Sequence, residues 1–168
     1  GSKLIEALKE KDKKAQIRCW GGDLMKKAGG ELVKHFNELA FMGFWEVITN
    51  LGAIIRNIKF CKKNILEFDP DVIIYIDYPG FNLRISKWAK KQGFKNHFYI
   101  SPQVWAWKEN RVHQMKKNLD ALYVILPFEK EFFEIKHQFS VKFVGHPLLD
   151  RVMHREKNSR FLIGSTLG

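Results

Sequence analysis

Residues 72–82 read Val-Ile-Ile-Tyr-Ile-Asp-Tyr-Pro-Gly-Phe-Asn, and this stretch decides the fold. Its apolar start is short, rich in β-branched residues and bounded by Pro70 and Pro79, which is typical of a buried parallel strand. In an open α/β sheet, ligands bind at the carboxyl ends of such strands. Asp77 follows the apolar run directly and is therefore a candidate for chemistry. The structural alternative is that Asp77 caps the next helix or braces the loop.

Strands and helices alternate on both sides of this stretch. Further strands or extended pieces are expected at residues 17–20, 31–36, 97–100, 121–126 and 141–144. Helices are expected at residues 3–14, 24–28, 44–68, 82–92, 104–117 and 128–136, with Asn82 capping the fourth. The alternation predicts an α/β fold, a doubly wound parallel sheet with helices on both faces. We expect residues 1–152 to form this domain and residues 153–168 to be a tail or a truncated linker.

Four strand ends bring polar or conformationally special residues to one edge of the predicted sheet. These residues are Asp77, Ser101 with Pro102, Glu129, and Gly145 with His146. A carboxylate at this edge can act as a general base toward a sugar or alcohol hydroxyl. Each residue also has a structural alternative: Ser101 can cap a helix, Glu129 can stabilise a first helical turn, and His146 can hold its loop.

Two tryptophans lie in the helix that follows Ser101. Trp105 and Trp107 are two positions apart, so they cannot both face one core. At least one of them is expected to face the sheet edge or a partner.

The composition points to an anionic partner. The chain has 29 basic and 18 acidic side chains, a net charge of +11, and such a charge attracts nucleic acid, anionic membranes or phosphorylated ligands. Cys19 and Cys61 show no metal-binding spacing, which favours a reducing compartment. No glycine-rich phosphate loop, dinucleotide fingerprint or nucleophile elbow is present.

An aromatic cluster precedes the longest predicted helix. Residues 40–45 read Ala-Phe-Met-Gly-Phe-Trp, and the polar side of helix 44–68 carries Arg56, Lys59, Lys62 and Lys63. Apolar side chains beside cations are typical of a membrane interface. The alternative is that the cluster belongs to the core and the lysines are simply solvated. A nucleic-acid role is less favoured, because no RNA-binding aromatic motif lies on a strand.

Six motifs in a fixed order resemble lipid-A-disaccharide synthase, the glycosyltransferase family 19 enzyme of Gram-negative outer-membrane assembly. They occupy residues 20–25, 39–47, 70–72 with 76–82, 99–107, 126–129 and 144–150. The runs Ser-Pro-x-Val-Trp-Ala-Trp and Ala-x-Met-Gly-x-x-Glu-Val are the most specific. The resemblance covers residues 1 to 152.

The resemblance implies the Rossmann-like, acceptor-side half of a GT-B glycosyltransferase. The family enzyme transfers 2,3-diacylglucosamine from UDP-2,3-diacylglucosamine to 2,3-diacylglucosamine 1-phosphate with inversion, releases UDP, and uses no metal or other cofactor. The family's base falls on Asp77. Substrate contacts are expected at Asn82, Ser101, Pro102, Trp105, Trp107, Glu129, Gly145 and His146.

The resemblance also implies a membrane-facing patch. Contact with the membrane or with acyl chains is expected at Met42, Phe44, Trp45, Val47, Ile48, Leu51, Ile54 and Ile55. The expected location is cytoplasmic and peripheral, on the inner face of the inner membrane. Nucleic acid is not an expected partner, and a homo-oligomer is left open.

The sequence departs from the family at both ends. The chain starts just beyond the family's first strand and Gly-Glu-x-Ser-Gly-Asp loop, and the UDP-sugar domain has no counterpart in it. We therefore expect this chain alone to form no disaccharide. The competing hypothesis is a non-catalytic α/β module that binds membranes or anionic partners.

Overall fold

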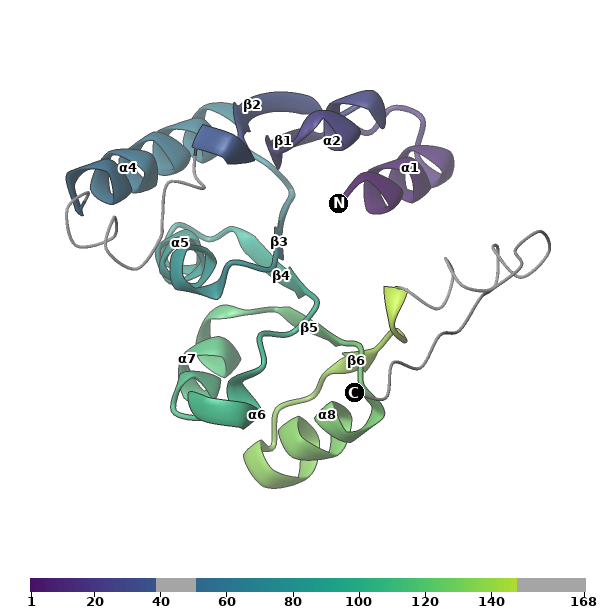
Figure 1. The fold of residues 1–168 in the computed structure, drawn as a ribbon, viewed down its shortest axis with the longest axis vertical. Coiled ribbons are helices and arrows are strands. Elements are labelled where there is room, and N and C mark those ends of the chain that lie inside the picture. The colour runs from purple at the N-terminus through teal and green to yellow at the C-terminus, as the bar shows by residue number, and fades with distance from the viewer. Residues whose placement is uncertain (39–50, 148–168) are drawn as a thin grey trace, which may run out of the picture. The chain divides into compact units, whose positions relative to one another are not determined.

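The computed structural model describes residues 1–38 and 51–147, and the chain divides into two compact units, Gly1–Asp71 and Val72–Gly168 (Figure 1). The described residues of the first unit form a two-stranded parallel sheet with three helices and one short 3₁₀ turn. Its elements are α1 (Ser2–Lys11), β1 (Arg18–Gly21), α2 (Asp23–Lys27), β2 (Glu31–His35), η1 (Phe36–Glu38) and α4 (Leu51–Phe68).

Close packing in the first unit requires a glycine between α2 and β2. A Cβ atom on Gly30 would lie 2.9 Å from Cys19 Sγ and 3.2 Å from the backbone oxygen of Met25. The ring of Phe60 on α4 packs near Trp20 on β1, with the ring centroids 5.6 Å apart. This contact joins the long helix to the small sheet.

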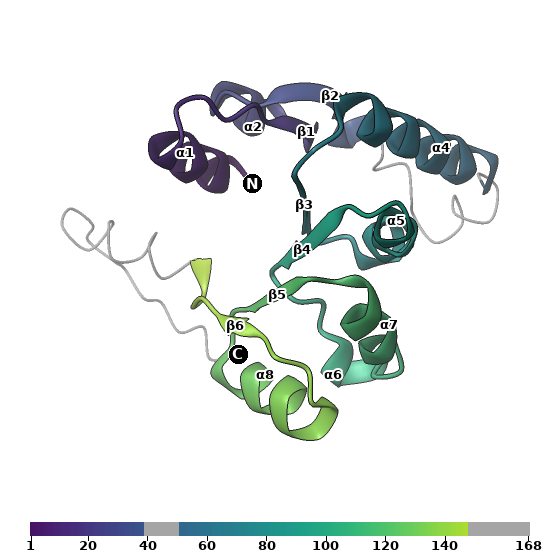
Figure 2. The same ribbon diagram turned by 180° about the vertical axis from the view of Figure 1, so that it is seen from behind.

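Up to residue 147, the second unit forms a four-stranded sheet in which all neighbours are parallel and the order is β3-β4-β5-β6 (Figures 1 and 2). Its strands are β3 (Val72–Ile76), β4 (Lys95–Tyr99), β5 (Ala121–Val124) and β6 (Lys142–Phe143). Its helices are α5 (Pro79–Lys91), α6 (Val104–Trp107), α7 (Arg111–Asn118), α8 (Pro127–Glu131) and the π-helical turn η2 (Phe132–Lys136). The carboxyl ends of all four strands therefore meet at one edge, and the predicted α/β class is confirmed.

The core of the second unit contains one buried polar network. Tyr75 Oη on β3 donates to Asn96 Oδ1 on β4 at 2.8 Å. Asn96 Nδ2 donates to the backbone oxygens of Ser86 at 3.2 Å and Asn118 at 3.0 Å. The amide of Asn96 thus satisfies its donors and its acceptor inside the protein, as a buried amide must. The network connects the first two strands with α5 and α7.

Two expectations about helices were wrong. The helix expected at residues 104–117 is broken into α6 and α7, because Lys108 leaves the helical region with φ of −143° and ψ of 47°. Glu109 in the break forms ion pairs with Lys136 at 2.8 Å and His137 at 2.9 Å. Asn82 does not cap a helix, because α5 begins three residues earlier with Pro79 in its first turn. The helix expected from residue 44 is described from Leu51 onward, and its first residues lie outside the described part.

Candidate functional site

Asp77 lies at the carboxyl end of β3 in the left-handed region of backbone space, with φ of 56°. Its side chain is exposed, and among the residues that the structure describes its carboxylate has no hydrogen-bond or ion-pair partner. Tyr78, not Asp77, occupies the N-cap position of α5. The capping alternative is therefore excluded, and the carboxylate is open to a ligand.

Asn82 holds the backbone of this turn. Its Nδ2 donates to the backbone oxygen of Asp77 at 2.7 Å and approaches that of Ile76 at 3.4 Å. Tyr78 also has a positive φ, 45°, and such a conformation costs about 1–3 kcal/mol for a residue other than glycine. Asn82 thus braces a strained turn, which is the role that the sequence also allowed for Asp77.

The turn after β4 is strained as well. Ile100 has φ of 71°, which is a genuine outlier for a β-branched residue. The next residue, Ser101, is buried; its backbone N–H donates to the oxygen of Tyr123 at 2.9 Å and its hydroxyl to that of Pro102 at 3.1 Å. Ser101 does not cap α6, whose N-cap is Gln103.

Backbone strain in the described chain concentrates at this edge of the sheet. Three of its five non-glycine residues with positive φ are Asp77, Tyr78 and Ile100. They follow two neighbouring strands at the edge where ligands bind in this architecture. Strained residues of this kind cluster at functional sites.

Glu129 is buried and faces inward. Its Oε2 accepts the backbone N–H groups of Ile125 at 3.1 Å and Leu126 at 2.9 Å. Its Oε1 accepts the indole N–H of Trp105 at 3.3 Å. The ring of Phe128 meets the ring of Trp105 edge-on, with centroids 5.0 Å apart. Glu129 therefore ties the turn after β5 to the helix that follows β4.

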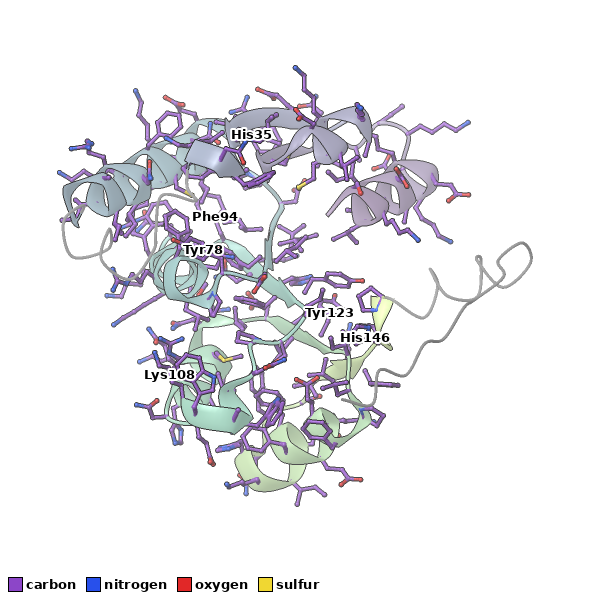
Figure 3. All side chains as sticks on the ribbon, in the orientation of Figure 1. His35, Tyr78, Phe94, Lys108, Tyr123 and His146 are labelled. Carbon is purple, nitrogen blue, oxygen red and sulfur yellow. The ribbon has the colours of Figure 1, made fainter. Side chains whose placement is uncertain are left out.

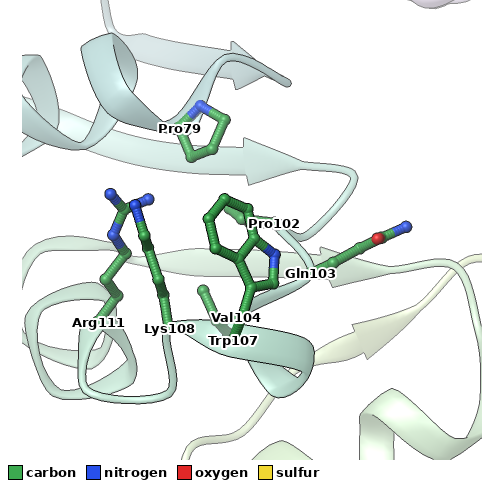
Figure 4. A pocket seen from close by; sticks show the side chains of 7 residues that line it. All are labelled: Pro79, Pro102, Gln103, Val104, Trp107, Lys108 and Arg111. Carbon is green, nitrogen blue, oxygen red and sulfur yellow. The ribbon is translucent and has the colours of Figure 1, made fainter.

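The two tryptophans separate as the sequence predicts. Trp105 is partly buried against these residues, whereas Trp107 is 74% exposed. Trp107 lines a shallow pocket, open to solvent, at the carboxyl ends of β3 and β4 (Figure 4). The pocket is lined, among others, by Pro79, Pro102, Gln103, Trp107, Lys108 and Arg111.

The last predicted strand end lies apart from this pocket. Gly145 follows β6 with φ of 75°, and His146 is partly buried next to it. Lys108 and His146 lie on different sides of the second unit (Figure 3). Within the described part, no hydrogen bond or ion pair joins Asp77 to Ser101, Glu129 or His146. The structure thus brings Pro102 and Trp107 together at the pocket, with Pro79 of the turn that follows Asp77, rather than forming one cluster of all the predicted residues.

Sequence reasoning overlooked two cations of the pocket. Lys108 directly follows the Ser-Pro-x-Val-Trp-Ala-Trp run, and Arg111 comes three residues later. Their position beside a motif with predicted substrate contacts could have indicated them as site residues. Both cations lie with Trp107 at the pocket, Lys108 at the C-cap of α6 and Arg111 as the first residue of α7.

The first unit has a sheet edge of its own. The Trp-Gly-Gly-Asp run crosses the carboxyl end of β1, and a Cβ on Gly22 would lie 2.5 Å from Phe36 Cε1. His35 at the end of β2 has its Nε2 3.8 Å from Asp23 Oδ2. Asp23 and His35 were not among the predicted site residues.

Most of the predicted membrane contacts lie outside the described residues. These are Met42, Phe44, Trp45, Val47 and Ile48, and the side chain of Leu51 is also outside them. Ile54 is partly buried, and Ile55 is 53% exposed. Phe60 and Leu66 on the same helix are exposed too. Within residues 1–38 and 51–147, no helix is long and apolar enough to cross a bilayer.

The comparisons with known proteins agree on one family. Residues 1–162 match the family model described as lipid-A-disaccharide synthetase. The chain is 43% identical over 152 residues to the lipid-A-disaccharide synthase of Trichlorobacter lovleyi and 41% identical over 152 residues to that of Geobacter metallireducens. It is 36% identical over 148 residues to that of Coxiella burnetii.

These alignments cover 88% to 90% of the chain but only 39% of each relative. The chain thus spans about two fifths of the length of the curated relatives that it matches. The order of the motifs and the match over residues 1–162 lead to the same conclusion: the chain belongs to the lipid-A-disaccharide synthetase family.

Proposed function

We propose that this chain provides the acceptor side of a GT-B lipid-A-disaccharide synthase. The reaction transfers 2,3-diacylglucosamine from UDP-2,3-diacylglucosamine to 2,3-diacylglucosamine 1-phosphate, with inversion and release of UDP. One observation supports this most: the carboxylate of Asp77 is exposed and unpaired among the described residues, at the sheet edge where ligands bind. Membership of the family supplies the substrates for the proposal.

Asp77 acts as the general base in this proposal. A carboxylate oxygen accepts the proton of the acceptor hydroxyl while the hydroxyl oxygen attacks the anomeric carbon of the donor. The bond from that carbon to the diphosphate breaks, and UDP leaves with the electron pair. Proton transfer requires the acceptor hydroxyl within about 2.6–3.2 Å of the carboxylate, and it contributes roughly 10²–10⁴-fold to the rate.

The other predicted residues divide by their location, at the pocket and the end of β6 or within the turns that position the site. We assign direct substrate contact to Pro102 and Trp107, which line the pocket, and to Gly145 and His146 at the end of β6. Asn82, Ser101 and Glu129 act as positioning residues, since their side chains are bonded to backbone groups or to Trp105.

The proposed location is the cytoplasmic face of the inner membrane, where both lipid substrates would be within reach. A net charge of +11 and the exposed Ile55, Phe60 and Leu66 of α4 support peripheral binding to an anionic surface. The predicted patch from Met42 to Ile55 is part of this proposal.

The deciding experiment is Asp77→Asn in the full-length enzyme. The amide keeps the size of the side chain and cannot accept the proton, so we expect kcat to fall roughly 10²–10⁴-fold. Asp71→Asn is the matched control, since Asp71 is an exposed aspartate at the opposite end of the same strand. Unchanged transfer by Asp77→Asn would remove Asp77 from the mechanism.

A second candidate function is a binding module without chemistry, favoured by the charge and by the exposed apolar side chains of α4. Both functions predict binding to vesicles that contain anionic lipid. Only the enzyme predicts that Asp77→Asn abolishes disaccharide formation while vesicle binding is kept. A full-length protein that binds vesicles and forms no disaccharide would favour the module.

A further inference from the structure

Two cations of the pocket have no acidic partner within the described part of the chain. Lys108 and Arg111 line the pocket, and neither forms an ion pair there. Glu109 lies between them in the sequence, but its Oε1 is taken by Lys136 at 2.8 Å and His137 at 2.9 Å. The pocket therefore keeps two positive charges that no neighbouring carboxylate neutralises.

The pocket is also lined by an aromatic ring that contacts one of the two cations. Lys108 Nζ lies 4.6 Å from the centroid of the Trp107 ring, which holds the ammonium on the ring face. Lys108 and Arg111 extend in the same direction, toward Pro79 (Figure 4). Two like charges directed into one small pocket repel each other, and an anion between them removes that repulsion.

The N-terminus of α5 adds to the positive electrostatic potential of the pocket. Pro79 lines the pocket and begins this helix of 13 residues, and no side chain caps its N-terminus. A Cβ built on the exposed Gly80 would meet no atom within 4 Å, so space is open beside the first turn. The positive end of the helix dipole thus adds to the positive potential that the two cations create.

The chemistry of the pocket matches a phosphate ester on a sugar. A guanidinium and an ammonium together bind the oxygens of a phosphate, and the guanidinium can do so with two parallel hydrogen bonds. The exposed ring of Trp107 offers an apolar face to the sugar. Pro79, which lines the pocket, belongs to the same turn between β3 and α5 as Asp77, two residues earlier.

We propose that Lys108, Arg111 and Trp107 form the phosphate subsite for the acceptor, a sugar 1-phosphate, and direct its hydroxyl to Asp77. This inference rests on the proposed function for the identity of the acceptor. The diphosphate of the donor carries the same kind of anion, so the test must distinguish the two.

The first test measures binding without turnover. This chain is titrated with glucosamine 1-phosphate, glucosamine and UDP at low salt, by calorimetry. Glucosamine 1-phosphate is expected to bind, and the double variant Lys108→Gln, Arg111→Gln is expected to bind it at least about tenfold more weakly. The matched control is Arg84→Gln, Lys87→Gln, which removes two exposed cations with the same spacing from α5.

Three results would overturn the subsite. Glucosamine 1-phosphate fails to bind, or the control variant weakens its binding as much as the pocket variant does. A loss confined to UDP would assign the pocket to the diphosphate of the donor instead. Equal binding of glucosamine and glucosamine 1-phosphate would show that the phosphate is not recognised.

The second test uses the full-length enzyme and separates the two substrates. In the pocket variant, KM for the acceptor is expected to rise at least about tenfold while KM for the donor stays within about twofold. If the full-length protein has no transferase activity but the phosphate titration succeeds, the proposed function fails and the anion site stands. If transfer is active and neither titration nor KM changes in the variant, the function stands and the subsite fails.

Discussion

At the scale of single residues, the site depends on how the backbone around Asp77 is held. Asp77 and Tyr78 both lie in the left-handed region, and neither is a glycine. The hydrogen bond of 2.7 Å from Asn82 to the carbonyl of Asp77 fixes the turn from inside α5. The position of the carboxylate is thus set by a residue that it does not touch.

Replacing Asn82 with alanine tests this positioning role. The loss of the hydrogen bond costs about 0.5–1.5 kcal/mol, but alanine is the better helix former by up to about 0.7 kcal/mol. We therefore expect the free energy of unfolding to change by less than about 1 kcal/mol. The kcat of the full-length enzyme should fall about tenfold because Asp77 is no longer held in place.

Steady-state kinetics and urea unfolding of the Asn82→Ala protein measure the two quantities. A fall in kcat with KM unchanged would separate positioning from binding. An unchanged kcat, or a loss of stability above about 2 kcal/mol, would show that Asn82 serves the fold alone.

At the scale of secondary-structure elements, the amide of Asn96 connects four of them. It accepts from Tyr75 on β3 and donates to backbone oxygens of α5 and α7. Each of these groups is buried, so replacing Asn96 would remove its hydrogen-bond partner, and no water would take that place. The strand that presents Asp77 is thereby fixed against its neighbours.

Asn96→Ala is expected to reduce the free energy of unfolding by about 2–4 kcal/mol, from the unsatisfied polar groups and the cavity together. Denaturant unfolding measures the loss. Asn110→Ala is the control, because the exposed Asn110 precedes α7 without a side-chain capping bond. It should change stability by no more than about 0.5 kcal/mol, and an equal loss in both proteins would contradict the network.

Much of the element order could be predicted from the sequence, because local patterns control it. The strand at residues 72–76 was predicted at its observed bounds, since a short apolar run between prolines has few other solutions. The break between α6 and α7 could not be predicted, because no proline or glycine marks it and the partners of Glu109 in the break lie more than twenty positions away. Distant contacts of this kind leave no periodicity in the sequence.

The candidate site was predicted in position but not in detail. Parallel strands place Asp77, Ser101 and Glu129 at one edge, and this follows from topology. Whether each side chain faces solvent or the core depends on the turn conformation. Non-glycine residues with positive φ, such as Ile100, give no sequence signal for that conformation. The exposed Asp77 and the buried Glu129 are therefore told apart only by the structure.

At the scale of the whole molecule, stability is expected to depend on pH through His97. Burial lowers the pKa of His97 below its ordinary value of 6.5, the nearby Lys142 and Lys95 add to this, and Asp120 opposes it. Below about pH 6.5 the unfolded chain takes up a proton that folded His97 resists. The contribution of His97 to the free energy of unfolding is therefore fully present above pH 6.5 and is lost as the pH falls through the folded pKa.

Urea unfolding of this chain between about pH 7.5 and pH 5 measures how steeply the free energy of unfolding falls with pH. His97→Gln removes the titrating group, so the variant should lose less stability over this range than the parent does. The carboxylate of Asp120 adds a second decline at lower pH, because the hydrogen bonds from Lys90 and the Asn96 N–H outweigh its burial and lower its pKa. A variant that keeps the full slope near pH 6 would assign the effect to another group.

The strand order of the second unit has a consequence for synthesis. Sheet neighbours are also chain neighbours, since the order is β3-β4-β5-β6. During translation each strand can add to an edge formed by the strand released just before it, and none waits for a later one. Such vectorial assembly limits each loop closure to one strand–helix–strand crossover, whereas pairing strands from more distant parts of the chain would slow folding further. The turn that presents Asp77 can be in place before the final strand leaves the ribosome.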